Sequence, residues 1–326
     1  MDLYKKLKEF GKVKINEPLS KHTTFKIGGP ADFFVIVDST DKLVELLNFL
    51  IGEGIEYFLI GGGSNMLVSD EGFLGVVIST INNKQITIED EVVVVEAGAT
   101  TALVAQESMR NNLTGFEWGV GVPGTIGGAV RGNAGATGSE IKDTLKKVEV
   151  YRDGEVIELD NKDCKFGYRN SIFKHNTDII LRVYLRLEKS QNKVNGEARE
   201  DALGYKELMK IALGHLQYRN KTQPQGYSST GCIFKNFTIS GVAKLRNLNI
   251  PKEFIDSGKI PAGWLVQKAG MKGEKVGQAQ VSQDHGNFVV NLGGATARDV
   301  LTLIEKIKEK VYDKFGIELE EEIKIV

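Results

Sequence analysis

Residues 119–138 read GVGVPGTIGGAVRGNAGATG, a stretch dense in glycine. Its first six residues match G-x-G-x-x-G, the fingerprint of dinucleotide-binding Rossmann domains, and Asp143 follows at about the ~20 residues that the fingerprint asks for. The fingerprint also needs a buried strand before it and a helix that opens within it. The preceding NLTGFEW is a poor central strand, and Pro123 lies inside the motif. We therefore predict that the match is accidental and that no Rossmann domain is present.

The same stretch is better interpreted as a wall lined with small residues. Glycine at this density lets the backbone lie close to a large flat ligand. Tight turns between strands would account for the composition equally well. The glycines of this predicted wall are Gly121, Gly124, Gly127, Gly128, Gly132 and Gly135.

A second glycine loop, IGGGSN at 60–65, follows an apolar strand expected over 57–60. Consecutive glycines adopt conformations closed to other residues, so successive N–H groups can converge on an anion. Ser64 and Asn65 add side-chain donors beside them. The alternative is a simple hairpin turn, but such a turn seldom needs three glycines and two polar donors. We favour a ligand-binding loop.

Outward from these loops, hydrophobic periodicity divides the chain into three regions. The first is βαβ-like, with a short charged helix and a linker over 1–20, a strand at 33–37, a helix within 41–54 and a hairpin over 85–97. The second has a helix over 99–112, strands within 148–159 and 179–188, and a largely polar helix over 196–220.

The third region begins near Gln223, with strands near 276–282 and 288–292. Its clearest element is a helix over 295–316, in which Thr296 with Asp299 resembles a capping box and Gly316 stands where a helix-ending glycine belongs. The chain ends in an expected strand over 317–326. One apolar stripe of the helix consists of Val300, Ile304, Ile307, Val311 and Phe315.

Bulk composition excludes several classes of protein. The 326 residues are 41% hydrophobic and carry 42 basic against 43 acidic side chains, so the basic excess of a nucleic-acid-binding protein is missing. No apolar run reaches the ~20 residues that cross a bilayer, and the charged N-terminal segment is not a secretory signal. Two cysteines do not form a disulfide framework. We expect a cytoplasmic protein without nucleic-acid or membrane partners.

One of the two cysteines stands in an unusual place, within GYSSTGCIFKNF at 226–237. The stretch is small and polar before Cys232 and apolar after it. Lone cysteines are most often buried small hydrophobes, which is our expectation for Cys164. For Cys232 the same interpretation competes with that of a thiol exposed to a ligand.

Together these stretches resemble one family. FKIGGPADF, IGGGSNMLVSD, GVPGTIGGAVRGNAGA, GYRNSIFK, GCIFKN and a glutamate-bearing last strand occur in the same order in the UDP-N-acetylenolpyruvoylglucosamine reductases, from about residue 20 to the end. The resemblance implies an α+β fold: a two-subdomain FAD-binding part of the vanillyl-alcohol oxidase type and a smaller α+β substrate-binding domain. We expect these parts at 1–82, 83–220 and 221–314, followed by a terminal strand over 315–326.

The resemblance also implies an activity. In this family NADPH reduces a non-covalently bound FAD, the nicotinamide leaves, and the UDP-sugar enters the same cleft. Flavin N5 then delivers hydride to C3 of UDP-N-acetylglucosamine enolpyruvate, and C2 is protonated to give UDP-N-acetylmuramate, a peptidoglycan precursor. NADPH can thus be used without a Rossmann domain. A sugar or alcohol oxidase on the same flavin fold and a non-catalytic UDP-sugar- or flavin-binding protein remain alternatives.

Three residues fall at the family's catalytic positions. Arg169 in GYRNSIFK matches the arginine that grips the substrate carboxylate, where a planar guanidinium suits a bidentate contact. Cys232 matches the serine or cysteine that protonates C2, and a thiol is mostly protonated at neutral pH. Glu322 matches the glutamate of the terminal strand. Strict alternation of that strand puts Glu321, not Glu322, on its apolar face, so Glu321 remains an alternative.

Binding residues follow from the same resemblance. Tyr168, Asn236 and Lys272 match substrate contacts, Lys221 and Arg219 could help with the diphosphate, and Phe237 replaces a proline common in the family. The short interval between Arg169 and Cys232 indicates the shorter, type II, variant, and we expect a monomer. The predicted FAD-binding residues are Gly61, Gly62, Gly63, Ser64, Asn65, Met66, Gly121, Pro123, Gly124, Thr125, Gly127, Gly128, Arg131, Asn133, Gly135 and Lys324.

Overall fold

The computed structural model describes residues 2–190, 193–194, 197–198, 203–239 and 250–326. The chain divides into two compact units. Unit 1 comprises Met1–Glu17, Ala31–Gly62 and Leu74–Lys221, and unit 2 comprises Pro18–Pro30, Gly63–Phe73 and Thr222–Val326. Two short segments from the first quarter of the chain therefore belong to the same unit as the C-terminal third, which no local sequence pattern indicates.

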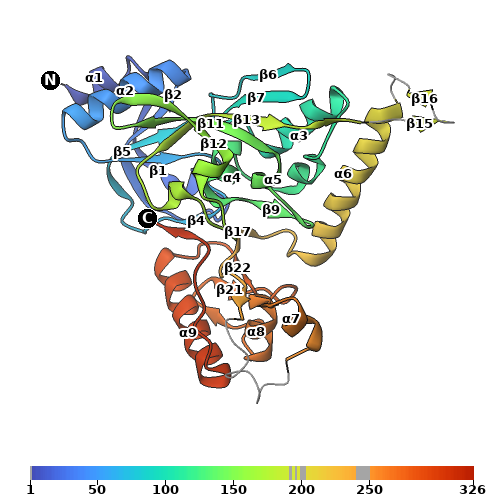
Figure 1. The fold of residues 1–326 in the computed structure, drawn as a ribbon. Helices are drawn as coiled ribbons and strands as arrows, with labels where there is room; N and C mark the ends of the chain where they lie inside the picture. The colour runs from blue at the N-terminus through green and yellow to red at the C-terminus, as the bar shows by residue number, and fades with distance from the viewer. Residues whose placement is uncertain (1, 191–192, 195–196, 199–202, 240–249) are drawn as a thin grey trace. The chain divides into compact units, whose positions relative to one another are not determined.

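A four-stranded sheet forms the first half of unit 1 (Figure 1). Helix α2 (Thr40–Gly52) begins at Ser39, whose Oγ accepts a hydrogen bond from Lys42 N, and it buries a leucine stripe in the core beside the sheet. The expected linker after helix α1 (Leu3–Leu7) is wrong, because those residues form the edge strand β1. The strands lie in the order β1 (Gly11–Pro18), β2 (Pro30–Val37), β5 (Phe73–Ser79) and β3 (Tyr57–Ile60).

A five-stranded antiparallel sheet forms the second half of unit 1. The expected hairpin is confirmed as β6 and β7, and the polar helix begins at Leu203, while residues 199–202 lie outside the described part of the chain. The strand order is β12 (Glu155–Asp160), β11 (Leu145–Arg152), β13 (Ile179–Arg186), β7 (Val92–Glu96) and β6 (Ile86–Glu89). The helices are α3 (Thr101–Arg110), α4 (Ile126–Gly132), α5 (Ile141–Thr144) and α6 (Leu203–Thr222).

Short strand pairs complete unit 1. They are β8 (Leu113–Thr114) with β14 (Glu188–Lys189), β9 (Gly135–Ala136) with β10 (Ser139–Glu140), and β15 (Lys193–Val194) with β16 (Glu197–Ala198).

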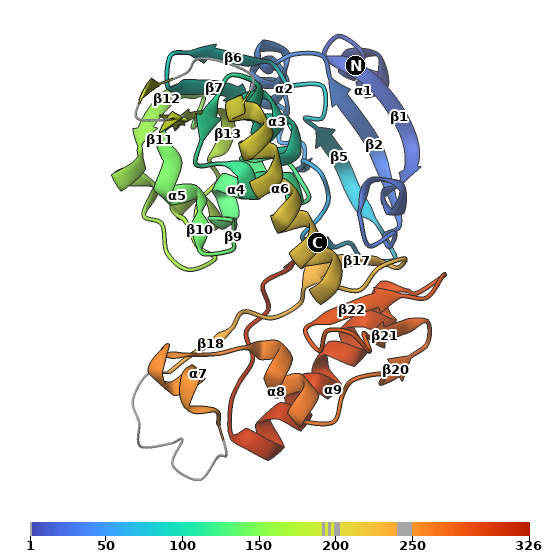
Figure 2. The ribbon, with the colours of Figure 1, turned by 90° about the vertical axis from the view of Figure 1, so that its right-hand side faces the viewer.

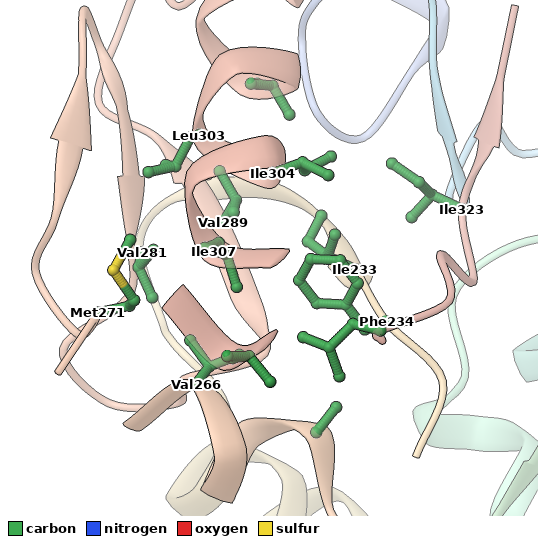
Figure 3. Packing of buried hydrophobic residues seen from close by; sticks show 14 of the residues in the cluster. Ile233, Phe234, Val266, Met271, Val281, Val289, Leu303, Ile304, Ile307 and Ile323 are labelled. Carbon is green, nitrogen blue, oxygen red and sulfur yellow. The ribbon is translucent and has the colours of Figure 1, made fainter. Parts of the chain in front are cut away.

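Unit 2 is built on another four-stranded sheet, which is antiparallel. Helices α8 and α9 pack into the hydrophobic core of this unit (Figures 2 and 3). The strand order is β17 (Ser228–Cys232), β22 (Phe288–Asn291), β21 (Ala279–Val281) and β20 (Lys275–Val276). The remaining elements are α7 (Lys252–Asp256), α8 (Ala262–Lys268), α9 (Ala297–Phe315), the antiparallel pair β18 (Phe237–Thr238) and β19 (Lys259–Ile260), and the parallel pair β4 (Met66–Leu67) and β23 (Lys324–Ile325).

Helix α9 confirms the sequence prediction in detail. Thr296 and Asp299 form a reciprocal capping box, and the chain leaves the helix at Gly316 with φ of 65°. Val300, Ile304, Ile307 and Val311 are buried in the unit 2 core. Figure 3 shows Ile304 and Ile307 in the same cluster as Ile233 and Phe234. The expected terminal strand is shorter than predicted, because only Lys324–Ile325 pairs as a strand. Among the described helices, none combines the length and apolar character that a bilayer crossing requires.

Candidate functional site

The two glycine loops meet inside unit 1. A Cβ added to Gly62 would lie 2.7 Å from the Cα of Gly124, and one added to Gly61 would collide with the hydroxyl of Thr125. The two loops are therefore so close together that Gly61 and Gly62 could not be replaced by a residue with a side chain unless the loops moved apart. A 3-10 turn over Glu117–Gly121 leads into the motif in place of a strand, and helix α4 begins only after it, so the expectation of an accidental Rossmann match is confirmed.

Helix α4 presents an open face of small residues. Thr125 caps its N-terminus, its hydroxyl accepting from Gly128 N. A Cβ added to Gly132 would have no atom within 4 Å, and one added to Gly128 would meet only the Thr125 hydroxyl, at 3.5 Å. Arg131 lies on the same face, and burial lowers the pKa of its guanidinium. A wall of exposed backbone with one cation fits a flat, anionic cofactor such as FAD.

Other glycines of the predicted wall make room for protein groups instead. A Cβ on Gly121 would lie 2.6 Å from Cδ of Arg219, which reaches over it from α6. A Cβ on Gly127 would lie 2.8 Å from that of Ala97, and one on Gly135 would lie 2.8 Å from Cγ of Glu140. These three positions are glycine because neighbouring chain packs there, which the sequence did not distinguish from contact with a ligand.

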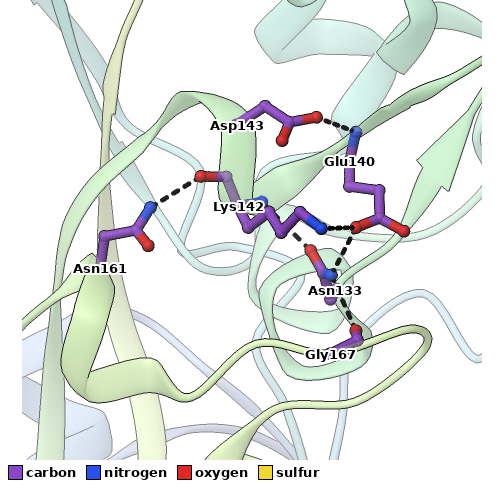
Figure 4. Close-up of polar contacts among 6 residues, drawn as sticks. All are labelled: Asn133, Glu140, Lys142, Asp143, Asn161 and Gly167. Carbon is purple, nitrogen blue, oxygen red and sulfur yellow. Dashed lines mark hydrogen bonds and ion pairs between the residues drawn. The ribbon is translucent and has the colours of Figure 1, made fainter.

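Asn133 ends helix α4 in the left-handed conformation, with φ of 43° and ψ of 56°, and it is fully buried. Its Nδ2 donates to Glu140 Oε2 at 3.0 Å and to Gly167 O at 2.9 Å, and its Oδ1 accepts from Lys142 N at 3.1 Å (Figure 4). Its side chain therefore links the end of the wall to the GYRN loop. The polar atoms of its side chain are thus all hydrogen-bonded to protein, and the cofactor contact predicted for Asn133 stays a prediction for its backbone.

Arg169 stands at the tip of that loop. Gly167 and Asn170 bond each other through both backbone pairs, at 3.0 and 3.1 Å, and Arg169 between them has φ of 52°. Its Nη2 donates to Gly135 O at 3.0 Å, and its guanidinium lies 5.5 Å from the centre of the Tyr168 ring. A non-glycine residue in this conformation costs about 1–3 kcal/mol, and such strain clusters at functional sites.

In unit 2, Cys232 ends strand β17 just after a bulge. Ser229 pairs with Val290 and Cys232 with Phe288, so two residues, Thr230 and Gly231, oppose one residue of β22. Gly231 has φ of 81°, the left-handed conformation that such a bulge requires. The bulge re-aims the side chain that follows it. Cys232 is half-buried, whereas the other thiol, Cys164, is fully buried.

Thr230 connects this strand to the tail of the IGGGSN loop. Its buried hydroxyl accepts from Met66 N at 2.8 Å and lies 3.2 Å from both Ser64 O and Met66 O. The terminal strand joins the same place: Lys324 N donates to Asn65 O at 3.1 Å, and Asn65 Nδ2 donates to Glu322 O at 3.1 Å. Three segments therefore meet in unit 2: the end of the IGGGSN loop at 64–66, the strand that carries Thr230 and Cys232, and the C-terminal segment that carries Glu322.

Ile233 and Phe234, directly after Cys232, lie between Asn287 and the C-terminal segment that contains Glu322. On one side Ile233 N donates to Asn287 O, and the Asn287 amide accepts from Phe234 N at 2.9 Å and donates to Phe234 O at 2.8 Å. On the other side Glu322 N donates to Ile233 O at 2.7 Å. Asn287 is buried, and sequence reasoning missed it because its partner lies far away in the chain.

The two adjacent glutamates have different surroundings. Glu321 forms a bridge with Phe234, whose side chain is buried, and its carboxylate accepts from Lys308 Nζ of α9 at 2.9 Å. This hydrogen bond raises the pKa of Lys308. The carboxylate of Glu321 therefore faces Lys308 of α9.

The predicted substrate contacts in unit 2 are also placed. Asn236 Oδ1 accepts from Ala262 N at 3.1 Å, at the start of α8. Lys272 is half-buried beside His285. Burial lowers the pKa of His285, and the positive charge of Lys272 lowers it further. Arg169 and Tyr168 belong to unit 1, and Cys232, Glu322, Asn236 and Lys272 to unit 2.

Comparison with known proteins gives agreement along the whole chain. Residues 223–326 match the family described as UDP-N-acetylenolpyruvoylglucosamine reductase, C-terminal domain, and residues 31–160 match the FAD binding domain family. The UDP-N-acetylenolpyruvoylglucosamine reductase of Caldanaerobacter subterraneus is 39% identical over 100% of this chain and 97% of its own. That of Bacillus subtilis is 36% identical over 98% and 96%.

A solved structure agrees as well. The crystal structure of UDP-N-acetylenolpyruvylglucosamine reductase from Thermus caldophilus is 31% identical, with a TM-score of 0.72 over 96% of this chain and 98% of that one. The predicted α+β fold, an FAD-binding part followed by a smaller C-terminal domain, is confirmed.

Proposed function

The chain belongs to the UDP-N-acetylenolpyruvoylglucosamine reductases, in their shorter variant, and we propose that Arg169, Cys232 and Glu322 act on the enolpyruvyl group of its substrate. It is an FAD-dependent oxidoreductase that reduces UDP-N-acetylglucosamine enolpyruvate to UDP-N-acetylmuramate with NADPH, in peptidoglycan precursor synthesis. The alternatives of an oxidase and of a non-catalytic binding protein are thereby set aside.

Bound FAD supplies the hydride, which originates from NADPH and is added to C3 of the enolpyruvyl group. The backbone of Gly61, Gly62, Gly124 and Thr125 and the open face of α4 would hold the cofactor. Support for this role comes from the match of residues 31–160, which contain both loops, to the FAD binding domain family.

Arg169 binds the substrate carboxylate. Hydride addition at C3 leaves negative charge on C2 and on the adjacent carboxylate, and a fixed guanidinium stabilises that charge most as it develops. Support comes from the strained backbone at Arg169 and from the bond of its Nη2 to Gly135 O, which together preorganise the side chain. Tyr168, beside it, contacts the substrate.

Cys232 donates its thiol proton to C2. The S–H bond breaks, a C2–H bond forms, and the thiolate that remains must regain a proton before the next turnover. Support comes from the bulge at Gly231, which re-aims Cys232, and from its partial exposure. A cysteine thiol holds its proton at neutral pH and is therefore able to give it.

Glu322, not Glu321, is the carboxylate of this group. The Glu321 carboxylate binds Lys308, whereas the backbone N–H of Glu322 donates to the carbonyl of Ile233, the residue after Cys232. We assign to Glu322 the return of a proton to the thiolate. Asn236 and Lys272 contact the UDP-sugar, and Lys221 and Arg219 assist with its diphosphate.

The larger organisation is also proposed. Residues 1–82 and 83–220 form the two FAD-binding subdomains, 221–314 bind the substrate, and 315–326 carry Glu322. The sheets of unit 1 divide near the first of these boundaries, which supports it. We further propose a cytoplasmic monomer, acting on a nucleotide-activated sugar.

The observation that carries the proposal is the bulge at Gly231, because a buried structural thiol would not need one. The test separates the two half-reactions in anaerobic stopped-flow. Cys232→Ala should leave flavin reduction by NADPH within about twofold and slow sugar-dependent reoxidation by about 10²–10⁴-fold. Cys232→Ser should retain much of the rate. Unchanged reoxidation in Cys232→Ala would contradict the assignment of the acid.

A further inference from the structure

We propose that Asn133 is a positioning residue for Arg169: its buried amide fixes the loop that presents the guanidinium to the substrate carboxylate. The inference rests on the proposed function of Arg169. If so, the position of the Arg169 side chain is determined by the end of helix α4, which belongs to the glycine-lined wall that would hold the flavin.

The first argument is the completeness of the Asn133 contacts. A side-chain amide offers two donors and one oxygen, and all are used: Nδ2 to Gly167 O and to Glu140 Oε2, and Oδ1 from Lys142 N. Two of these partners are backbone atoms from segments far apart in the chain. Fully satisfied buried networks of this kind specify one arrangement of the groups they join.

The second argument is where the anchors lie. Gly167 is two residues before Arg169, and Ser171, two residues after it, donates from Oγ to Arg131 O at 2.7 Å. Both anchors attach to the last turn of α4, at Asn133 and Arg131. Arg169 itself bonds Gly135 O, two residues beyond Asn133. The loop is thus fixed to one short stretch of wall on both sides of its tip.

The third argument is the role of Glu140. Its backbone N–H and side chain form a capping box with Asp143 at the start of α5, so its position is fixed (Figure 4). Its carboxylate accepts from Asn133 and pairs with Lys142 Nζ at 2.8 Å. Burial raises the pKa of Glu140, but the hydrogen bonds from Lys142 and Asn133 and the charges of Lys142 and Arg169 outweigh it and lower the pKa. Glu140 therefore stays an acceptor that orients the Asn133 amide.

A purely structural Asn133 would have a different signature. If it only terminated α4, its loss would weaken the wall and with it flavin binding. A positioning residue instead leaves FAD binding and NADPH oxidation intact and changes only the step that uses the sugar carboxylate. The two half-reactions therefore separate the two roles.

Two variants keep the backbone of Asn133 acceptable. Asn133→Gly retains the left-handed conformation and removes the amide. Asn133→Asp retains the shape and the acceptor for Lys142 N, but puts a second oxygen against Glu140 Oε2 and Gly167 O. We expect the KM for the UDP-sugar to rise about 10- to 100-fold in Asn133→Asp, and less in Asn133→Gly. The FAD dissociation constant, from flavin fluorescence, and the rate of flavin reduction should stay within about twofold.

A matched control and a rescue are available. Asn161 Nδ2 also donates to two backbone carbonyls, Lys142 O and Leu145 O, both at 2.7 Å, but its amide does not bond the Arg169 loop. Asn161→Asp makes the same chemical change and should leave the KM for the sugar within about twofold. In Asn133→Asp combined with Glu140→Gln, the new amide can donate to the aspartate, so part of the lost affinity should return.

Hydrogen exchange of the segment 166–172 completes the test, because it reports on the loop regardless of activity. Exchange there should quicken in Asn133→Asp and not in Asn161→Asp. The positioning role is wrong if hydrogen exchange and KM are both unchanged in Asn133→Asp. It is also wrong if the affinity for FAD falls in that variant. Arg169→Met is measured in parallel. Unchanged KM in that variant alone, with quickened exchange in Asn133→Asp, would sink the proposed role of Arg169 but not the anchoring.

Discussion

Arg169 of unit 1 and Cys232 of unit 2 are both aimed by their surroundings, but by different devices. The Arg169 loop is fixed by side chains: the amide of Asn133, the hydroxyl of Ser171 and the guanidinium itself bond backbone carbonyls. The Cys232 segment is fixed mainly by backbone pairing, to β22 on one side and to the glutamate segment on the other. The direction of Cys232 is then set by one bulge.

This difference indicates how each unit responds to substitution. Where a few side chains hold a loop, the loss of one buried amide loosens the loop. Where several backbone bonds hold a segment, no single side chain is decisive, and the residue presented can change, as between serine and cysteine, without altering the frame. The exceptions in unit 2 should be the few side chains that the backbone pairing depends on. The predictions below test that statement, beginning with the largest effect.

The sharpest test within unit 2 uses the two neighbouring glutamates. Glu322→Gln should lower kcat for the complete reaction by about 10²–10⁴-fold, because it removes the group that returns a proton to the Cys232 thiolate. Glu321→Gln, the matched control, loses only a partly exposed ion pair with Lys308, which is worth about 0–1 kcal/mol. Its rate should stay within about twofold. Steady-state kinetics of the two variants would contradict the assignment if their effects were reversed.

Buried hydroxyls provide the next test. Thr230→Val in unit 2 leaves the buried Met66 N–H without its partner, which costs about 1–3 kcal/mol of the free energy of unfolding. Ser171→Ala in unit 1 removes a donor from a carbonyl, which should cost less, about 0.5–1.5 kcal/mol. Urea denaturation of both variants measures the difference. A larger loss in Ser171→Ala would overturn the ranking of the two units.

Much of this organisation could be predicted from the sequence. Helix α9 with both of its caps and the β6–β7 hairpin follow from local patterns, because each buries one face at a regular spacing. Strand β1 could not be predicted. It is an edge strand whose pattern is broken by lysines, and Ile15 is 53% exposed. Its pairing with β2 decides its structure, and the sequence contains no local sign of that pairing.

The site divides in the same way. Arg169 and Cys232 stand in recognisable motifs, and the alternation at Glu321 was visible in the sequence. The residues that hold them, Asn287 and Thr230, have partners more than fifty residues away in the chain, at Phe234 and Met66. The sequence also could not show that protein packs against Gly121, Gly127 and Gly135, because a glycine that makes room for a ligand cannot be distinguished from one that makes room for protein.

The bulge can be tested against an equivalent strain elsewhere in unit 2. Gly231 and Gly226 have φ of 81° and 80°, and neither has an atom within 4 Å of an added Cβ. Each Gly→Ala change therefore costs only backbone strain, about 1–2 kcal/mol. Both variants should lose similar stability, but Gly231→Ala alone should slow sugar-dependent reoxidation, by about tenfold. Equal rates in the two variants would show that the bulge does not aim Cys232.

The smallest expected effect compares the two thiols. Burial raises the pKa of Cys164 to about 12, with smaller contributions from the charges of Asp163 and Asp160. A cysteine in the unfolded chain titrates near ~8.5, so between these values the folded state keeps a proton that the unfolded state releases. The contribution of Cys164 to stability is therefore complete below pH ~8.5 and is lost as the pH rises toward 12.

The loss should be on the order of 1 kcal/mol by pH ~9.5, measured as a fall in the thermal midpoint. Cys164→Ala should flatten this alkaline slope, whereas Cys232→Ser, the matched control, should keep it. Iodoacetamide on the native protein should modify Cys232 well before Cys164, since only the thiolate reacts and Cys164 is buried. Equal labelling of both thiols in the folded enzyme would mean that the bulged strand exposes Cys232 no more than the core of unit 1 exposes Cys164.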